Sequence, residues 1–509
     1  MNVMPSKVFS GAIVGLDAQL IEVQIDVSHG LRSFTIVGLP DKTVEESKER
    51  IESAIKNSKL LSPHGRTFRI LINLAPADVK KEGSLYDLPI ALAFLIASKQ
   101  TSFNPERRLF LGELSLDGTL RPIKGALSFA LLAQKQGFEE IILPRQNANE
   151  ASLIKNLKII GVGSLSEALS YLENRIKIES HAFKNQDPVS GMQNTVDISW
   201  VKGQEYAKRA LEITAAGAHN LFFSGPPGGG KSLLAKALPS ILPALTFQES
   251  LEVTKIYSVA GLLKENETMV ASRPFRAPHH IASEASVLGG GTPLRPGEIT
   301  LAHRGVLFLD EFPEFHRDVL ESLRQPIEEG EITISRAKNS CTFPSRFMLV
   351  GASNPCPCGF LNSPERACIC SPSQVAMYRR KLSGPLMDRI DIFIEVPAVK
   401  YEKLAEASDQ NQSNRIREKI EQARNIQKSR FISDNILSNS EMQIPQIKKY
   451  CQTDGRSQEL LKKYVDSGKL SARGYHRILK VARTIADLAE IANIQYEHIA
   501  EALMYRLKS

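Results

Sequence analysis

The chain has 509 residues, enough for about three domains of ~150 residues each. Hydrophobic residues make up 42% and charged residues 24%, which is ordinary globular usage and excludes a fibrous or wholly disordered chain. Lys and Arg total 64 against 56 Asp and Glu, and the resulting net charge of +8 permits contact with a phosphate polymer without requiring it.

Hydropathy and cysteine usage limit the cellular compartments in which the protein can work. The longest apolar stretch, 88–97, is far shorter than the about 20 residues that a membrane-spanning helix needs. No signal-peptide pattern is visible at the N-terminus, so we expect a cytoplasmic protein without membrane contact. Four of the 6 cysteines cluster, at Cys356, Cys358, Cys368 and Cys370. In a reducing cytoplasm such clustering favours a metal site over disulfides.

Residues 1–175 alternate strand-like and helix-like segments, which predicts an α/β domain. The expected strands are 20–27, 33–37, 68–74 and 140–143; the expected helices are 43–59, 85–98 and 126–136; a hairpin is expected at 109–120 and a last strand and helix within 158–174. Asp41 is placed to cap the first helix. Residues 176–198 are polar, with Pro188 and Gly191, and are predicted to be a linker.

From 199 to 400 the pattern becomes strand, loop and helix, and it contains a nucleotide motif. A strand at 221–223 runs into a phosphate-binding loop of the form G-x-x-x-x-G-K-[ST], made of Gly225, Pro226, Pro227, Gly228, Gly229, Gly230, Lys231 and Ser232. Glycines let backbone N–H groups point at phosphates, and the following helix adds its positive N-terminal end. We expect Lys231 to hold the β- and γ-phosphates of ATP and Ser232 to hold Mg²⁺.

Two later strands end in polar side chains. The apolar run 305–309 leads into Asp310 and Glu311. Adjacent strand residues point in different directions, so Asp310 can orient the Mg²⁺ shell while Glu311 polarises the attacking water. The strand at 347–351 is followed by Asn354, which is a candidate for positioning that water. The alternative for Asn354 is a strand-end residue that supports a turn.

These motifs, in this order and spacing, resemble an AAA+ ATPase followed by a helical lid at 401–509. The segments RPFRAPHH (273–280), LAHRG (301–305) and NPCPCG (354–359) are similar to the magnesium-chelatase-like branch. The chain as a whole resembles the ComM (YifB-type) family. That resemblance implies a Lon-protease-like (S5-like) α/β domain at 1–175, a P-loop αβα core with an insert after its second helix and a hairpin before its sensor strand, and a C-terminal helical lid.

The resemblance also implies a ring, expected to be a hexamer, with each ATP held between two subunits. Arg389 is where related proteins keep the arginine finger that reaches a neighbour's ATP, and Arg473 resembles their sensor-2 arginine. A guanidinium suits both roles because it stays charged and binds phosphate oxygens with fork geometry. Either arginine could instead form an ordinary ion pair.

The family resemblance further implies DNA as the substrate. It predicts ATP-driven branch migration that extends heteroduplex in homologous recombination during natural transformation, with recombination proteins as possible partners. The strand-like runs around 331–343 predict a hairpin that aims Arg336 and Lys338 at a nucleic-acid backbone. Arg273 and Arg276, in an insertion spanning 257–297, are further candidate DNA contacts. The alternatives are a solvated hairpin and an insertion that only packs against its neighbours.

The cysteine pairs could supply four thiolates to one tetrahedral Zn²⁺ with a structural role. Their C-x-C spacing is tighter than the usual C-x₂₋₄-C, and reduced thiols in a tight loop are the alternative. Because Cys356 follows Asn354 closely, a metal here would stiffen the loop beside the ATPase site.

The N-terminal resemblance rests on KKEGS (80–84), GEL (112–114) and PIKG (122–125). A working Lon-type protease needs a Ser nucleophile and a Lys base. Leu127 stands where the base is expected, so we predict a proteolytically inactive domain that serves ring assembly or contacts DNA. The rival reading of the whole chain is a chelatase- or MoxR-type motor that remodels protein, and stimulation of the ATPase by DNA would separate the two.

Overall fold

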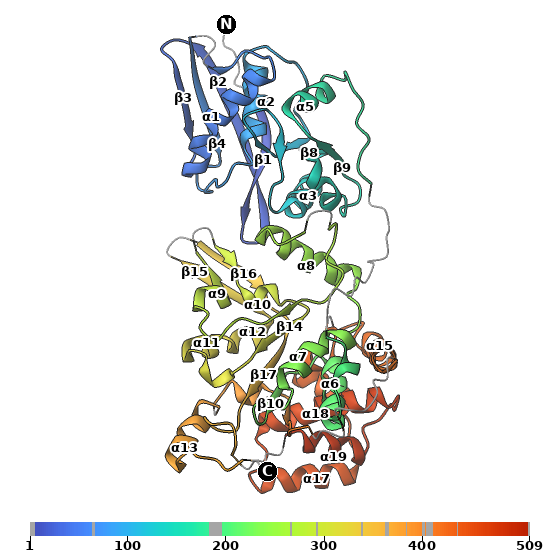
Figure 1. Cartoon of the computed structure of the whole chain (residues 1–509). Helices are drawn as coiled ribbons and strands as arrows, with labels where there is room; N and C mark the ends of the chain where they lie inside the picture. The colour runs from blue at the N-terminus through green and yellow to red at the C-terminus, as the bar shows by residue number, and fades with distance from the viewer. Residues whose placement is uncertain are drawn as a thin grey trace. The chain divides into compact units, whose positions relative to one another are not determined.

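The computed structural model of the chain describes residues 6–63, 67–182, 196–264, 267–291, 294–336, 339–361, 366–382, 384–399, 403, 411–434 and 436–506. They form two compact units, coloured along the chain in Figure 1. The first unit combines the chain up to 189 with 247–270 and 291–295, and the second contains the remainder. Most of the predicted linker, 183–195, lies outside the described residues.

The first unit is an α/β fold on a seven-stranded sheet in the order β3-β4-β2-β1-β5-β8-β9. Its elements are β1 (Ser6–Val14), β2 (Asp17–His29), β3 (Ser33–Val37), α1 (Lys42–Asn57), β4 (Phe68–Ala75), α2 (Asp87–Ala97), β5 (Arg108–Phe110), β6 (Glu113–Leu114), β7 (Leu120–Arg121), α3 (Ala126–Lys135), β8 (Glu140–Pro144), α4 (Ala148–Ala151), β9 (Lys158–Val162), α5 (Leu165–Leu172) and α8 (Phe247–Ala260). The expected hairpin is shorter than predicted, because only β6 and β7 pair while β5 joins the main sheet.

Helices cover both faces of this sheet. On β8, Ile142 belongs to a core shared with α1, α2 and α5, whereas its neighbour Ile141 belongs to a core shared with α3 and α4. Successive strand side chains point to opposite faces, so the two cores lie on opposite sides of the sheet. Helix α1 begins as predicted, because the Asp41 carboxylate accepts a 2.8 Å hydrogen bond from the Val44 amide.

Helix α8 belongs to the first unit although its sequence lies inside the predicted ATPase core. The Ser258 carbonyl accepts a 3.2 Å bond from the Gly125 amide at the start of α3. The Ser258 hydroxyl donates to Glu150 of α4, whose carboxylate also accepts a 2.7 Å bond from the Leu127 amide. Burial raises the pKa of Glu150. These side-chain and backbone partners explain why α8 groups with the first unit.

The second unit has a five-stranded sheet in the order β11-β14-β17-β10-β18, whose paired strands are all parallel. Its elements before the lid are α6 (Glu205–Gly217), β10 (Leu221–Ser224), α7 (Lys231–Ala237), β11 (Phe275–Arg276), α9 (Glu284–Leu288), α10 (Glu298–Leu301), β14 (Val306–Leu309), α11 (Arg317–Ser322), α12 (Arg324–Glu329), β15 (Glu331–Arg336), β16 (Asn339–Pro344), β17 (Met348–Ser353), α13 (Pro372–Lys381) and β18 (Ile392–Glu395). The short strands β12 (Gly289–Gly290) and β13 (Arg295–Pro296) form a separate two-stranded sheet.

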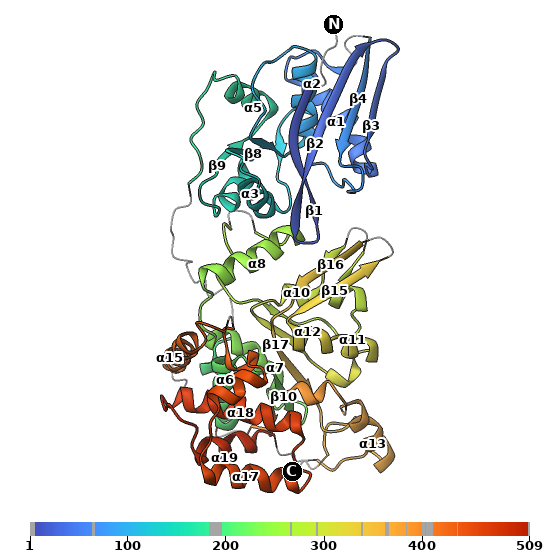
Figure 2. The same cartoon turned by 180° about the vertical axis from the view of Figure 1, so that it is seen from behind.

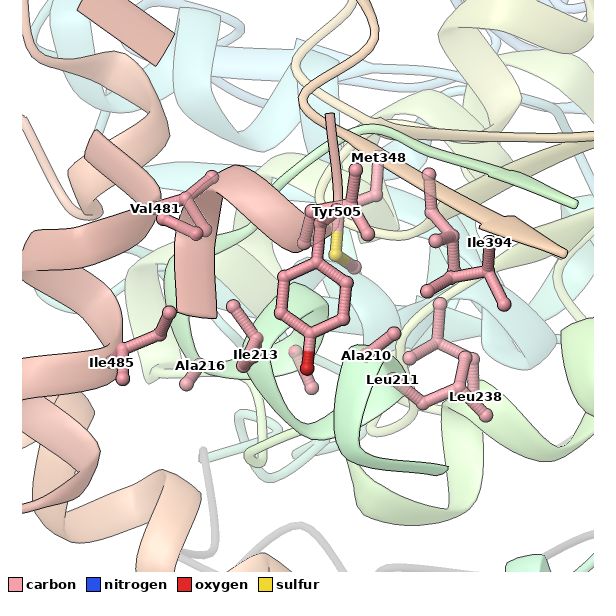
Figure 3. Close-up of a cluster of buried hydrophobic side chains, with 14 of the residues drawn as sticks. Ala210, Leu211, Ile213, Ala216, Leu238, Met348, Ile394, Val481, Ile485 and Tyr505 are labelled. Atoms are coloured by element: carbon pink, nitrogen blue, oxygen red, sulfur yellow. The ribbon is translucent and has the colours of Figure 1, made fainter. Parts of the chain in front are cut away.

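The helical lid contains α15 (Gln412–Arg430), α16 (Ile444–Tyr450), α17 (Gly455–Asp466), α18 (Ala472–Leu488) and α19 (Tyr496–Met504). It shares one hydrophobic core with the parallel sheet. Figure 3 shows Ile213 and Ala216 of α6 beside Val481 and Ile485 of α18, and in Figure 2, as in Figure 1, α6 lies next to α18 and α19. Among the helices in the described part of the chain, none combines the length and apolar character needed to cross a membrane.

Candidate nucleotide-binding site

The phosphate-binding loop lies at the carboxyl end of β10 and leads directly into α7. Gly228 and Gly230 have φ values of 78° and 86°, a region that L side chains rarely adopt. At Gly225 a Cβ atom would stand 2.1 Å from the Val396 carbonyl oxygen, so only glycine lets the loop pack against the end of β18. Glycine is therefore required at these positions for two different physical reasons.

Lys231 is buried at the centre of the loop. Its ammonium group donates to the carbonyl oxygens of Gly225 at 2.6 Å and Pro226 at 2.8 Å, and to the Asn354 side-chain oxygen at 3.1 Å. Desolvation by burial lowers the pKa of Lys231. The lysine thus joins the loop to the strand β17, after which Asn354 stands.

The acidic residues that follow β14 face the start of α7. The Ser232 hydroxyl donates to the Asp310 carboxylate at 2.6 Å, so the two expected Mg²⁺ ligands are adjacent. Glu311 has φ 50°, a left-handed conformation that is uncommon for a residue other than glycine and often marks functional sites. Its side chain is 60% exposed, and its carboxylate lies 3.1 Å from His280 Nδ1.

Asn354 is held at its backbone as well as at its side chain. Its amide donates to the Tyr378 hydroxyl of α13, and burial raises the pKa of that tyrosine to about 12. His280 and Tyr378 are contacts that the sequence analysis missed. The His279-His280 pair in the RPFRAPHH segment was a visible signal, whereas nothing local marks Tyr378 as a partner of Asn354.

Arg389 lies at the opposite end of the sheet from the phosphate loop. It precedes β18, which pairs in parallel with β10, and its carbonyl accepts a 3.2 Å bond from the Asn220 side chain just before β10. Its guanidinium is 2.5 Å from the Glu328 carboxylate and donates to the Pro385 carbonyl at 2.7 Å. Arg473 is exposed near the start of α18.

The candidate DNA contacts differ in what surrounds them. The hairpin is present, with β15 and β16 paired from Glu331↔Pro344 to Arg336↔Asn339. Lys338 and the Arg336 side chain lie outside the described residues.

The two arginines of the insertion are engaged within the protein. Arg273 donates to the carbonyls of Pro243 and Arg304, each at 2.7 Å. Arg276 forms a two-pronged ion pair with Glu298, at 2.6 and 2.7 Å. These partners are the kind that the packing alternative expects, and the DNA contact stays a prediction.

The clustered cysteines and Ser84 of the KKEGS segment can also be located. The side-chain sulfurs of Cys356, Cys358, Cys368 and Cys370 lie within 4.8 Å of one another. In the first unit, the Ser84 hydroxyl donates to the Glu113 carboxylate. A hydroxyl that donates to a carboxylate is not arranged as the Ser–Lys pair of a Lon-type protease.

A parallel sheet of this order, with a phosphate loop, an acidic pair and a polar residue along its carboxyl edge, defines a P-loop ATPase of the AAA+ class. Three family models match along the chain. They are "Magnesium chelatase, subunit ChlI" over 197–404, "Subunit ChlI of Mg-chelatase" over 23–147, and "Magnesium chelatase, subunit ChlI C-terminal" over 410–506.

Individual relatives narrow the class to a family. The chain is 42% identical over 506 residues to the competence protein ComM of Haemophilus influenzae, covering 98% of this chain and 97% of the relative. It is 40% identical over 505 residues to the uncharacterized protein YifB of Escherichia coli, at 98% and 97% coverage. The magnesium-chelatase 38 kDa subunit of Rhodobacter capsulatus is 29% identical over 175 residues, which is 31% of this chain and 49% of the relative. The chain belongs to the ComM/YifB family of magnesium-chelatase-like AAA+ proteins.

Proposed function

We propose that this protein is an ATP-driven, ring-forming DNA motor that promotes branch migration, and so extends heteroduplex, in homologous recombination during natural transformation. The observation that carries the proposal is the assembled site at the carboxyl edge of the parallel sheet, where Ser232 bonds Asp310 and Lys231 bonds Asn354. The similarity over nearly the whole chain to a competence protein of Haemophilus influenzae supports the choice of pathway.

The residues present fit a magnesium–nucleotide complex. A hydroxyl and a carboxylate oxygen 2.6 Å apart, from Ser232 and Asp310, are the hard oxygen donors that Mg²⁺ prefers. When bound, Mg²⁺ neutralises charge on the phosphate oxygens. Lys231 then exchanges its carbonyl partners for phosphate oxygens, Glu311 accepts a proton from the attacking water, and Asn354 orients that water.

A neighbouring subunit supplies the arginine that completes each ATP site. Arg389 stands at the amino end of the strands, whereas the phosphate loop stands at their carboxyl end, so one chain does not bring the two together. In a head-to-tail ring, for which we propose a hexamer, each subunit presents its Arg389 to the next one's ATP. Arg473, exposed on the lid, is proposed to contact the phosphates as the sensor-2 arginine.

We propose that the β15–β16 hairpin contacts the DNA backbone through Arg336 and Lys338. Phosphate contacts bind without reading sequence, which a branch-migration motor requires. We also propose Arg273 and Arg276 as further DNA contacts, in which they would exchange their present carbonyl and Glu298 partners for phosphates. We further propose a cytoplasmic location, recombination proteins as partners, and no proteolytic activity for residues 1–175.

The test is the steady-state ATPase rate with no DNA, with single-stranded DNA and with a four-way junction, together with particle mass under each condition. We expect the rate to rise with DNA, the mass to reach that of a ring, and the junction to migrate only with hydrolysable ATP. Lys231→Ala is the matched control, because it should remove the rise in rate and the migration of the junction while the chain stays folded. A rate indifferent to every DNA, with intact ATP binding, would instead favour a chelatase- or MoxR-type remodelling motor.

A further inference from the structure

Two separate segments bring four thiols together beside the nucleotide site. Cys356 and Cys358 follow β17 directly, and Cys368 and Cys370 directly precede α13. The Cys356 sulfur lies 3.4 Å from that of Cys358 and 3.7 Å from that of Cys368, and the Cys358 and Cys368 sulfurs are 3.6 Å apart. All four sulfurs lie within 4.8 Å of one another, so they converge on a common point.

The separations among the Cys356, Cys358 and Cys368 sulfurs are close to those of a metal tetrahedron and are not those of a disulfide. With Zn–S bonds of about 2.3 Å, the sulfurs of a tetrahedral four-thiolate site stand about 3.8 Å apart. A disulfide requires about 2.05 Å, and the six cysteines, all within the described residues, are free. The three sulfur–sulfur distances therefore fall a few tenths of an ångström short of the zinc value and far from the disulfide value.

Backbone amides point at the sulfurs, as they do around metal-bound thiolates. The Cys358 amide donates to the Cys370 sulfur at 3.4 Å. The amides of Phe360 and Ile369 donate to the Cys358 sulfur. Four thiolates at this spacing need a cation among them, because each repels the others.

We propose that Cys356, Cys358, Cys368 and Cys370 bind one zinc ion, and that this zinc braces the nucleotide site. Binding converts the thiols to thiolates and releases their protons to solvent. Four sulfur ligands complete the tetrahedron and leave no open position, so the ion is structural and takes no part in ATP chemistry. The first cysteine pair would then be joined to the segment that starts α13, whose N-terminus is capped by Ser371.

The loop that carries the first cysteine pair touches the phosphate loop. Gly359, which closes a turn by donating to the Cys356 carbonyl at 3.0 Å, has no room for a side chain, since a Cβ would stand 2.5 Å from Pro227. Asn354, two residues before Cys356, bonds Lys231 by its side chain and Tyr378 of α13 by its amide. Zinc would therefore hold Asn354 and Pro227 in fixed positions relative to each other. This bracing role rests on the proposed ATPase function, whereas zinc binding does not.

The test begins with the metal content of the full-length wild-type protein, purified under reducing conditions without added metal and measured by elemental analysis. We expect about one zinc per chain. Chelation should release it together with four newly reactive thiols, and added zinc should protect them again. Cobalt in place of zinc should give the intense visible absorption of a tetrahedral thiolate site. Wild-type protein that binds neither metal, or that carries an iron–sulfur chromophore instead, would overturn the proposal.

Matched variants separate metal binding from ATP chemistry. Cys370→Ser should lose the zinc, whereas Cys341→Ser, in the hairpin, and Lys231→Ala, in the phosphate loop, should keep it. Reversible chelation of wild-type protein covers the case in which Cys370→Ser fails to fold. Stripping zinc should lower ATP turnover by about 10- to 100-fold, because a displacement of about 1 Å at a positioning group has effects of that size, and added zinc should restore it. Full turnover in the stripped protein would refute the bracing role while leaving zinc binding intact.

Discussion

Arg389 provides the sharpest test of the proposed ring. Its place in the fold predicts that two variants, each inactive alone, regain ATPase activity when they are mixed. Strands β10 and β18 pair over four residues each. At about 3.3 Å per residue, this length separates Arg389, at one end of the strands, from the phosphate loop, at the other end, by about 13 Å. Its guanidinium pairs with Glu328, a partner that it would exchange for the phosphates of a neighbour's ATP. We therefore expect Arg389 to act on a neighbour's ATP.

The expected magnitude follows from the role and from the geometry of a ring. An arginine finger contributes about 10³- to 10⁵-fold to turnover, so Arg389→Ala should lower the rate by at least about 10³ while ATP still binds. Lys231→Ala should be inactive for the opposite reason, since it binds no ATP but keeps its arginine. In a random equal mixture, about one quarter of the interfaces pair an ATP-binding chain with an intact neighbouring arginine. The mixture should thus hydrolyse ATP at on the order of a quarter of the wild-type rate, because about a quarter of its sites are complete.

The assay is steady-state ATP hydrolysis with DNA, on each variant alone and on the mixture, with particle mass confirming that mixed rings form. The double variant Lys231→Ala/Arg389→Ala is the matched control, because mixing it with Arg389→Ala builds the same rings without any intact arginine. Mixed rings that stay as inactive as the separate variants would refute the reasoning. So would an Arg389→Ala ring that hydrolyses ATP at the normal rate.

Glu311→Gln should keep ATP affinity and lose about 10²- to 10⁴-fold in turnover, measured by nucleotide binding and single-turnover hydrolysis; undiminished hydrolysis would remove it as the proton acceptor. Arg336→Ala with Lys338→Ala should weaken DNA binding and reduce the slope of log affinity against log salt by about 1.4–1.8, and an unchanged slope would exclude two phosphate contacts. Asp391→Asn should cost about 3–5 kcal/mol in the free energy of unfolding by urea, because the buried Asp391 carboxylate pairs with Arg477 at 2.5 Å. Although burial opposes it, Arg477 keeps the pKa of Asp391 below its usual range. The stability that the ion pair contributes is present above the pKa of Asp391 in the unfolded chain and is lost as the pH falls. The difference in free energy of unfolding between the wild-type protein and Asp391→Asn should therefore narrow below about pH 4, and a difference that does not change with pH would contradict the pairing.

The features that sequence predicts best here depend on neighbours along the chain. Asp41 caps α1 as expected, because a cap is decided by three or four consecutive residues. The phosphate loop and the Asp310-Glu311 pair sit on the expected loop and strand end, because spacing alone specifies a strand, a glycine turn and a helix. Parallel pairing then brings Asn354 to Lys231. Local pattern and sheet topology agree throughout this part of the site.

The features that were missed depend on partners distant in the chain. Arg273 and Arg276 look the same in sequence as any basic pair, and only the folded chain supplies the carbonyl groups and Glu298 that engage them. The strand β1 was not predicted, because its apolar run is short, yet it pairs with β2 along its whole length. The contact between His280 and Glu311 likewise joins an insertion to a strand end 31 positions away, which no local pattern encodes.

Helix α8 changes how this protein can be divided for experiment. The polypeptide leaves the second unit after 246, completes the helical layers of the first unit, and returns at 271. A truncation at the linker, which sequence alone would suggest, removes Glu150 and Gly125 and leaves the Ser258 bonds without partners. Such a fragment would expose a helix built to be covered, with aggregation as the expected result. Grafting the N-terminal region onto another ATPase meets the same obstacle. Besides the linker, the chain passes between the two units at four places, on either side of 247–270 and of 291–295, so the first unit is discontinuous in sequence.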